Sequence, residues 1–339
     1  MSSQNLVLVI GGTGAQGIPV VKALVSDGKY TCRVMTRSST SSSAKALASL
    51  PGVEIFEGDS YDEPTLRQAF IGCTYAFVNT NGFALGEKAE IYWGIRIYEL
   101  AAEFGVKHFL YAGLIYASKL GNWDPKYRTG HLDGKGKVAD YISAQPTSPM
   151  GWSVLTSCLY IEGLSQMMQP FPHPSEPNTM VFAVPLGEGK CPLIYLEDYA
   201  AYARWMFDTP SRSNGLNLNV ATEDIGWADV AAAFTAVTGK KAIYMDVSLD
   251  QYFSFPIFPD PELKVTNEGG NLDDPTLFTI RENFSGFWNS WKDNLSKRDY
   301  ALLDSILPNR VKSVKEWMEL TGYDGTPGQV LKQSVGYKA

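Results

Sequence analysis

The sequence has little of what several classes of site require. Its 339 residues include only three histidines and four cysteines, and neither type occurs at metal-ligand spacing or as a C-x-x-C pair. We therefore expect no metal centre. No apolar run approaches the roughly 18 residues of a membrane-spanning helix. The first ten residues carry no basic region, so they predict no signal peptide, and the cytoplasm is the expected location. Buried reduced thiols are expected at Cys32, Cys73, Cys158 and Cys191.

Positive charge is also in the minority. There are 29 lysines and arginines against 36 aspartates and glutamates, which gives a net charge of −7. Nucleic-acid backbones and anionic membranes are bound through basic patches, so neither is an expected direct partner. The hydrophobic fraction of 45% is typical of a globular protein with a sizeable core. The length allows one large α/β domain with an appended lobe, or two domains.

The stretch LVLVIGGTGAQG, residues 6–17, is the most informative part of the sequence. Its first five residues are apolar and predict a buried parallel strand, and apolar residues recur at helical spacing from Ile18 onward. Between them, Gly11, Gly14 and Gly17 form the pattern G-x-x-G-x-x-G. In such a unit the first glycine permits a tight turn, the second lets a pyrophosphate approach the backbone, and the third lets the helix pack closely. Because a helix N-terminus attracts phosphates, the stretch predicts a dinucleotide site.

The second predicted strand, residues 31–36, ends at Arg37 and is followed by the polar run SSTSSSAK. This is where such a fold reads the adenosine ribose, and an acidic residue here would repel a 2′-phosphate. A guanidinium instead pairs with phosphate through two parallel hydrogen bonds, so Arg37 favours NADP(H) over NAD(H). Lys45 is a second basic candidate. The alternative is that Arg37 is only a solvated arginine at a strand end.

Strands and helices alternate through residue 113, which predicts an α/β fold with a doubly wound parallel Rossmann sheet. We expect an NADP(H)-binding domain over residues 1–160, completed by strands from about residues 193–220. Residues 161–339 would form mainly a smaller α+β lobe that contacts a substrate or partner, and the proline-rich segment 167–192 would be irregular. The expected strands are 6–10, 31–36, 53–57, 75–80, 108–111, 152–157, 216–220 and 242–247, and the expected helices are 18–25, 63–71, 87–104, 131–142, 193–207 and 227–237.

The C-terminal third is rich in aromatic residues. One interpretation is that they pack the C-terminal lobe. The other is that several of them line an apolar ligand pocket over the nicotinamide. Trp123 and Tyr160 are further candidates for pocket walls. The aromatic residues in question are Tyr252, Phe253, Phe255, Phe258, Phe278, Phe284, Phe287, Trp288 and Trp291.

Six motifs distributed along the chain carry a family resemblance. They are GGTGAQG at 11–17, TRS at 36–38, EGDSYDEPTLRQAF at 57–70, VNTN at 78–81, GVKHFLYAGL at 105–114 and HLDGKGKVADYI at 131–142. Together, over nearly all of residues 6–247, they resemble the NmrA-like family, atypical members of the short-chain dehydrogenase superfamily.

This resemblance implies a set of cofactor contacts. The Asn79–Asn81 cluster is also expected there because it follows the fourth strand, and the carboxyl ends of parallel strands form the ligand crevice. Lys135 would reach the nicotinamide ribose, and the segment 158–161, with Tyr160, would pack against the nicotinamide. The remaining implied contacts are Thr13, Gly14, Ala15, Gln16 and Gly17 to the pyrophosphate, Arg37 to the 2′-phosphate, Asp59 to the adenine edge with Ser60 beside it, and Asn79, Thr80 and Asn81 to the ribose region.

One departure from the superfamily pattern concerns catalysis. Short-chain dehydrogenases generally use Tyr-x-x-x-Lys, and here the same spacing joins His131 to Lys135, one helical turn apart. The missing tyrosine resembles the NADP-sensor branch of the family. His131 could still act as a general acid or base near neutral pH, or Lys135 could serve alone, as in the related isoflavone-reductase-like enzymes. His131 as a helix-entry residue without a catalytic role is the alternative.

Two functions therefore follow from the sequence. The first is an enzyme in which NADP(H) exchanges a hydride with a bulky apolar small molecule of carbonyl, imine or enone type. The second is a non-catalytic NADP(H) sensor that regulates a protein partner. Lys135 and the aromatic residues favour the enzyme, whereas the missing tyrosine favours the sensor.

Overall fold

The computed structural model describes residues 5–265 and 272–331, which form two compact units. Unit 1 contains the residues up to Leu114 together with 134–157 and 199–219. Unit 2 contains Ile115–Asp133, Cys158–Asp198 and the residues from Val220 onward. No helix formed by the described residues is long and apolar enough to cross a membrane.

Unit 1 is built on a seven-stranded parallel sheet with the strand order β11-β6-β5-β4-β1-β2-β3. The strand order reverses between β1 and β4, and in such sheets ligands bind at the carboxyl ends of the strands beside this point. The sheet confirms the predicted doubly wound fold. Its strands are β1 (Asn5–Ile10), β2 (Tyr30–Thr36), β3 (Val53–Glu57), β4 (Tyr75–Val78), β5 (His108–Gly113), β6 (Gly151–Thr156) and β11 (Leu216–Asn219).

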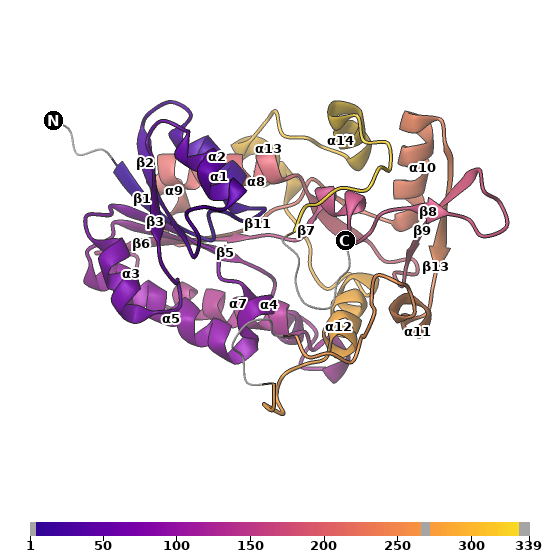
Figure 1. Ribbon diagram of the computed structural model, residues 1–339, viewed down its shortest axis with the longest axis horizontal. Coiled ribbons are helices and arrows are strands. Elements are labelled where there is room, and N and C mark those ends of the chain that lie inside the picture. Colours follow the sequence, from indigo (N-terminus) through magenta and orange to yellow (C-terminus); the bar gives the residue numbers. More distant parts are fainter. Residues whose placement is uncertain (1–4, 266–271, 332–339) are drawn as a thin grey trace. The chain divides into compact units, whose positions relative to one another are not determined.

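Helices cover both faces of this sheet (Figure 1). On one face, Arg204 of α8 donates hydrogen bonds to the carbonyl oxygens of Ala23 (2.8 Å) and Leu24 (3.1 Å) near the end of α1. These bonds satisfy carbonyls that a helix end would otherwise leave unpaired. The opposite face carries α3, α5 and α7. The helices of this part are α1 (Gly17–Val25), α2 (Ser42–Ala48), α3 (Glu63–Phe70), α4 (Gly82–Leu85), α5 (Glu87–Glu103), α7 (Gly130–Ser143), α8 (Leu196–Asp208) and α9 (Pro210–Ser213).

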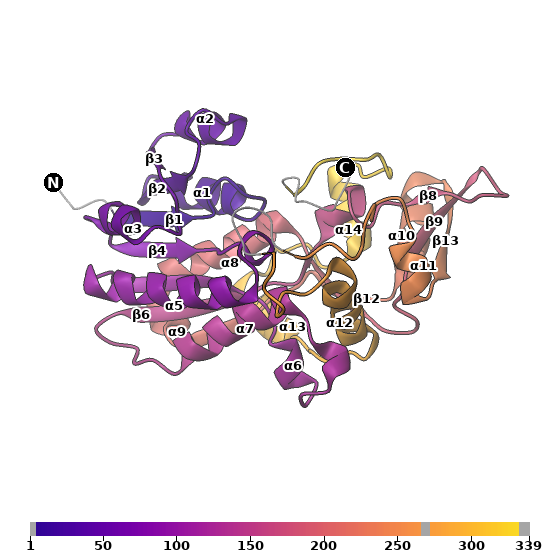
Figure 2. The same ribbon diagram turned by 60° about the horizontal axis from the view of Figure 1, so that its bottom comes forward.

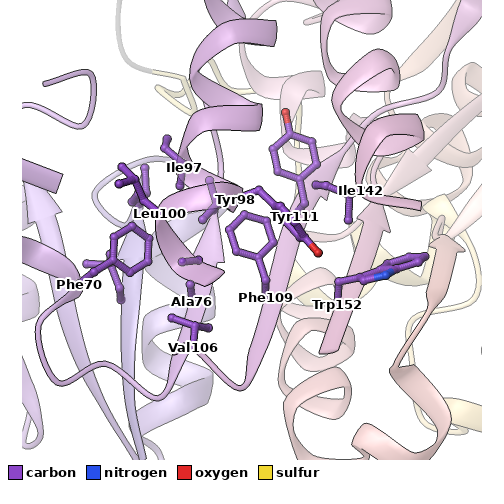
Figure 3. Packing of buried hydrophobic residues seen from close by; sticks show 14 of the residues in the cluster. Phe70, Ala76, Ile97, Tyr98, Leu100, Val106, Phe109, Tyr111, Ile142 and Trp152 are labelled. Atoms are coloured by element: carbon purple, nitrogen blue, oxygen red, sulfur yellow. The ribbon is translucent and has the colours of Figure 1, made fainter. Parts of the chain in front are cut away.

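The core of unit 1 lies between the sheet and the helices α3, α5 and α7. Phe70, Leu100 and Phe109 are completely buried there, with Tyr111 and Trp152 beside them (Figure 3). At roughly 25 cal/mol per Å² of apolar surface, such large side chains stabilise the sheet–helix contact most. This packing holds the carboxyl ends of β4 and β5 in fixed positions.

Unit 2 contains two three-stranded sheets, ordered β12-β10-β7 and β13-β9-β8. Helix α10 packs along β13 and β9 (Figure 2). The strands are β7 (Leu159–Tyr160), β8 (Phe171–Pro172), β9 (Thr179–Val184), β10 (Cys191–Ile194), β12 (Glu223–Ile225) and β13 (Lys241–Asp246). The helices are α6 (Ala117–Leu120), η1 (Pro125–Tyr127), η2 (Ile161–Ser165), α10 (Trp227–Thr238), α11 (Leu249–Phe253), α12 (Ile280–Lys292), α13 (Tyr300–Ile306) and α14 (Val314–Thr321).

Two expectations about the chain order need correction. The segment 167–192 is not irregular, because it contains β8, β9 and the start of β10. The helix expected from residue 193 begins at Leu196, since residues 191–194 pair with β7 and β12. The two units interleave along the chain, with 115–133 in unit 2 and 199–219 in unit 1. Unit 1 is defined by the pairing of β11 with β6 and by the contact between α8 and α1, not by chain order.

The aromatic residues of the C-terminal third lie mostly in the interior of unit 2. Only Phe255 and Phe278 are partly exposed. This burial agrees with the packing interpretation, and pocket lining stays a prediction. The buried members are Tyr252, Phe253, Phe258, Phe284, Phe287, Trp288 and Trp291. The four cysteines are buried as well.

Candidate functional site

The glycine turn of unit 1 joins β1 to α1 through tight backbone contacts. Gly11 has a φ of 78°, and a Cβ there would lie 2.7 Å from the carbonyl oxygen of Asn79. The N–H of Gly14 donates to the carbonyl oxygen of Gly11 at 3.0 Å. A Cβ on Gly17 would lie 2.2 Å from the same oxygen. The turn can therefore close only with glycine at positions 11 and 17.

The same turn leaves room for an anion. A Cβ built on Gly14 would meet only the Gly11 carbonyl oxygen, at 3.2 Å, within 4 Å. Gln16 precedes α1 without a side-chain capping hydrogen bond to the helix, and its Oε1 instead accepts from Asn79 Nδ2 at 2.8 Å. An uncapped helix N-terminus beside an open glycine is the arrangement that a pyrophosphate needs. Thr13 and Gln16 are buried against this turn, and Ala15 is half-buried.

Arg37 is exposed just beyond the end of β2. Beyond it, Ser41 caps α2 by accepting from the N–H of Ala44 at 3.3 Å. The N–H of Ser39 donates to Glu57 Oε2 at 3.0 Å, and this contact with Ser39 lowers the pKa of Glu57. A carboxylate at the end of β3 thus contacts the segment that follows Arg37. Lys45, the second basic candidate, is exposed on α2.

The segments that follow β3 and β4 are connected by Tyr61. The carboxylate of Asp59 accepts from the N–H of Tyr61 at 2.9 Å, and the Tyr61 hydroxyl accepts from the N–H of Asn81 at 2.9 Å. Ser60 lies between these residues and is half-buried. The strand ends therefore bring Asp59 and Asn81 to one edge of the sheet, as their positions in the sequence predict.

Lys135 on α7 lies buried at the carboxyl ends of β4 and β5. Its Nζ donates to the carbonyl oxygens of Thr80 (2.8 Å) and Ala112 (3.3 Å). It also donates to Asn79 Oδ1 and Thr80 Oγ1, both at 3.1 Å. Because Asn79 in turn contacts Gln16, one chain of hydrogen bonds connects the glycine turn to this ammonium group. Among the predicted site residues, the structure brings Gln16, Asn79, Thr80 and Lys135 together.

His131 lies one turn before Lys135 on α7, but the division between the units falls between them. In unit 2 the His131 ring is buried beside the rings of Phe284 and Phe287, at centroid distances of 5.6 and 5.7 Å. Its Nδ1 lies 2.8 Å from Nδ2 and 3.1 Å from Oδ1 of Asn283. The amide therefore holds the ring in place, and sequence reasoning did not identify Asn283.

The two candidate pocket walls in unit 2 differ in environment. Tyr160 ends β7 half-buried, and burial raises the pKa of its hydroxyl. Trp123 is 64% exposed at a φ of 64°, with its ring edge-to-face against Tyr116 at 5.5 Å. The described residues contain no group of three or more His, Cys, Asp or Glu side chains placed to hold a metal ion.

Comparison with known proteins identifies the family. Residues 3–273 match the model of the NmrA-like family. The chain belongs to the NmrA-like family.

A curated relative from Aspergillus hancockii, an NmrA-like family domain-containing oxidoreductase, is 28% identical over 78% of this chain and 81% of its own. Two solved structures share the fold. NmrA, a negative transcriptional regulator solved with NAD, is 17% identical with a TM-score of 0.72, over 96% of this chain and 99% of its own. An NADPH-dependent quinone oxidoreductase of Escherichia coli, solved with NADPH, is 18% identical with a TM-score of 0.69, over 94% and 100%.

Sequence reasoning missed Glu90 in this NmrA-like protein. Glu90 is completely buried on α5, and its Oε1 accepts from Thr80 Oγ1 at 2.8 Å and lies 3.3 Å from Lys135 Nζ. Burial raises the pKa of Glu90 and lowers that of Lys135, and the attraction between the two groups opposes both shifts. The signal was present in the sequence: Glu90 is in helical register with the buried residues Gly94, Ile97 and Ala101, where an apolar residue is expected.

Unit 2 of the NmrA-like chain also holds a carboxylate that the sequence did not indicate. Glu162 Oε1 accepts from the N–H of Leu196 at 3.0 Å, whereas no described residue donates to its buried Oε2. Burial is the largest cause that raises its pKa from 4.5 to about 7. Its ionisation therefore costs stability in the folded state.

Replacing Glu162 with glutamine is expected to stabilise the protein at pH 8. Because the folded pKa lies above the unfolded one, the wild type loses stability as the pH rises from about 4.5 to 7. The amide keeps the acceptor for Leu196 and has no charge to bury, so Glu162→Gln should gain about 2 kcal/mol at pH 8 and nothing at pH 4. Urea unfolding at both pH values measures this, with the exposed Glu188→Gln as control. An equal change at both pH values would contradict the assignment.

Proposed function

We propose that this protein is an NADP(H)-dependent oxidoreductase of the cytoplasm that acts on a bulky apolar small molecule with a carbonyl, imine or enone group. The observation that carries this proposal is the buried ammonium of Lys135, which lies at the same edge of the sheet as the glycine turn. A lysine in such a position can hold a ribose hydroxyl or give a proton to a heteroatom. The oxidoreductase name of the Aspergillus relative and the NADPH of the quinone oxidoreductase structure support it.

Each part of the site would hold one part of the dinucleotide. The turn from Thr13 to Gly17 would bind the pyrophosphate, Arg37 the 2′-phosphate, and Asp59 with Ser60 the adenine edge. Asn79, Thr80 and Asn81 would lie at the ribose region. When bound, NADP(H) would supply or accept the hydride. The proton that a reduced carbonyl or imine needs would come from Lys135, with His131 as a second proposed acid–base group, and Tyr160 and Trp123 are proposed substrate contacts.

Replacing Arg37 with alanine is expected to weaken NADP⁺ binding by about 2 kcal/mol, or roughly 30-fold, because a charged hydrogen-bond donor to the 2′-phosphate is lost. Affinity for NAD⁺ should stay within about twofold. Titration calorimetry with both nucleotides measures the difference. Lys22→Ala, an exposed cation at the far end of α1, controls for net charge. Equal losses for both nucleotides would show that Arg37 does not bind the 2′-phosphate.

The proposed activity is tested by following NADPH absorbance with apolar carbonyl, imine and enone compounds. Turnover by the wild type that disappears in Lys135→Met would support the enzyme and assign Lys135 to it. If the Lys135→Met variant binds NADPH and still turns over at the wild-type rate, Lys135 has no role in the reaction. Apolar compounds that protect the wild type against thermal unfolding would identify ligands independently of turnover.

A sensor of the NADP(H) redox state is the alternative. One observation favours it: the Lys135 ammonium has three hydrogens, and the acceptors around it belong to the protein itself. The NmrA structure is that of a negative transcriptional regulator. A sensor would show no turnover with any compound of the panel, together with clearly unequal affinities for NADP⁺ and NADPH and a protein partner whose binding responds to them.

A further inference from the structure

The Glu90 carboxylate is held in a space that two glycines leave open. A Cβ on Gly82 would lie 2.2 Å from Glu90 Oε2, and a Cβ on Gly134 would lie 2.8 Å from the same atom. Gly82 begins α4 after β4, and Gly134 is the residue before Lys135 on α7. Two separate elements thus leave room for a carboxylate directly beside the Lys135 backbone.

Only one oxygen of this carboxylate has a partner. Oε1 contacts both Thr80 Oγ1 and Lys135 Nζ, while Oε2 accepts no hydrogen bond from any part of the chain that the structure describes. A completely buried, half-satisfied carboxylate is costly, and a well-packed apolar residue in its place is often neutral or stabilising. Stability of the fold therefore does not explain why a carboxylate occupies this position.

We propose that Glu90 is a positioning residue, whose carboxylate fixes the Lys135 ammonium against Asn79 and Thr80 and so keeps it placed and charged for the reaction. This inference rests on the proposed oxidoreductase function. Thr80 is the junction of the arrangement, since its hydroxyl donates to Glu90 Oε1 and accepts from Lys135 Nζ. Loss of the Glu90 charge would leave Lys135 with neutral oxygens alone.

The other titratable groups around Lys135 do not replace this carboxylate. Tyr111 of β5 places its ring 5.4 Å from Lys135 Nζ, and burial raises the pKa of its hydroxyl, so it stays neutral. Burial also raises the pKa of the nearby Tyr61. Glu87, one turn before Glu90 on α5, pairs with Lys137 at 2.5 Å.

The variant Glu90→Gln separates charge from shape, and Glu87→Gln is its matched control on the same pair of helices. With a neutral amide beside it, the Lys135 ammonium should lose its proton at a lower pH. In Glu90→Gln we expect kcat to fall at least tenfold at pH 8 with KM for the substrate within about threefold. The alkaline limb of the pH–rate profile should move down by about one pH unit or more. Glu87→Gln should match the wild type in kcat, in KM and in the position of the alkaline limb.

A second measurement does not depend on turnover. In protein labelled with ¹³C-lysine, the Cε signal of Lys135, assigned by its loss in Lys135→Met, reports the protonation of this amine directly. Its titration should move to lower pH in Glu90→Gln and not in Glu87→Gln. If Glu90→Gln fails to fold, Glu90→Asp keeps the charge one methylene farther away, and its Lys135 titration should lie within half a pH unit of the wild type while kcat falls.

An unchanged Lys135 titration in folded Glu90→Gln, or an equal shift in Glu87→Gln, would overturn the inference. So would a folded Glu90→Asp variant whose kcat equals that of the wild type. A shifted titration in Glu90→Gln with no turnover by the wild type on any substrate would instead count against the oxidoreductase function alone.

Discussion

Replacing Lys135 with methionine is expected to lower the free energy of unfolding by about 3–5 kcal/mol at pH 8. The change leaves the Glu90 carboxylate completely buried without a cation, and an uncompensated buried charge carries a cost of this size. Below neutral pH the loss should become smaller, because burial raises the pKa of Glu90 and its protonation removes the charge. For an acid with a raised folded pKa, stability falls as the pH rises.

Urea unfolding at pH 5 and pH 8 measures this loss and its pH dependence. Lys135→Met combined with Glu90→Gln should recover most of the stability at pH 8, since neither charge then remains. Lys137→Met is the matched control: its partner Glu87 is 10% exposed and Lys137 itself 32%, so its loss should stay below about 1 kcal/mol. Equal losses in the two single variants, or no recovery in the double variant, would show that the Lys135–Glu90 pair does not carry the cost.

The fold of unit 1 could be predicted because its signals are local. The apolar run at residues 6–10 predicts β1, which the structure has at Asn5–Ile10, and all six other expected sheet strands start within one residue of the observed ones. Each of β1, β2, β3 and β4 is followed by a glycine or polar turn and then by a helix. In a parallel sheet, strands buried on both faces read as continuous apolar runs, so the sequence marks them without knowledge of their neighbours.

Unit 2 could not be predicted to the same extent because its signals are not local. β8 has two residues and β10 has four, and both contain proline. Proline in so short a segment argues against a strand when the segment is considered by itself. Segments of unit 2 become strands through partners far along the chain. One example is β9, which pairs with β13.

The candidate site shows the same limit at the level of side chains. Gln16, Asn79 and Lys135 could be placed together because strand ends and the glycine turn fix their positions. Glu90 and Asn283 could not, because a polar residue on a helix gives no information about which way it faces until its partner, 45 or 152 residues away, is known. The contact of Glu57 with Ser39 could not be predicted for a similar reason, because Glu57 lies at the end of a neighbouring strand.

Replacing Gly17 with alanine is expected to abolish NADPH binding, with a loss of at least 100-fold, or about 2.7 kcal/mol. The new Cβ would lie 2.2 Å from the Gly11 carbonyl oxygen and 2.5 Å from Gly12 Cα. Both are backbone atoms, and ordinary contacts require about 3.5 Å, so turn and helix would have to separate by roughly 1 Å. The N–H groups of the helix would then no longer reach the phosphates.

Two glycine variants separate this effect from general strain. Gly28→Ala, at the other end of α1, meets no atom within 4 Å and suffers only from its φ of 74°. It should lose about 1 kcal/mol of stability and keep its NADPH affinity. Gly14→Ala meets the Gly11 carbonyl oxygen at 3.2 Å, so it should fold nearly as the wild type and yet bind NADPH more weakly, because its methyl group occupies the proposed phosphate position. Fluorescence titration with NADPH and thermal unfolding together distinguish the variants Gly17→Ala, Gly28→Ala and Gly14→Ala. NADPH affinity that is retained in Gly17→Ala, or lost in Gly28→Ala, would show that the turn does not bind the pyrophosphate.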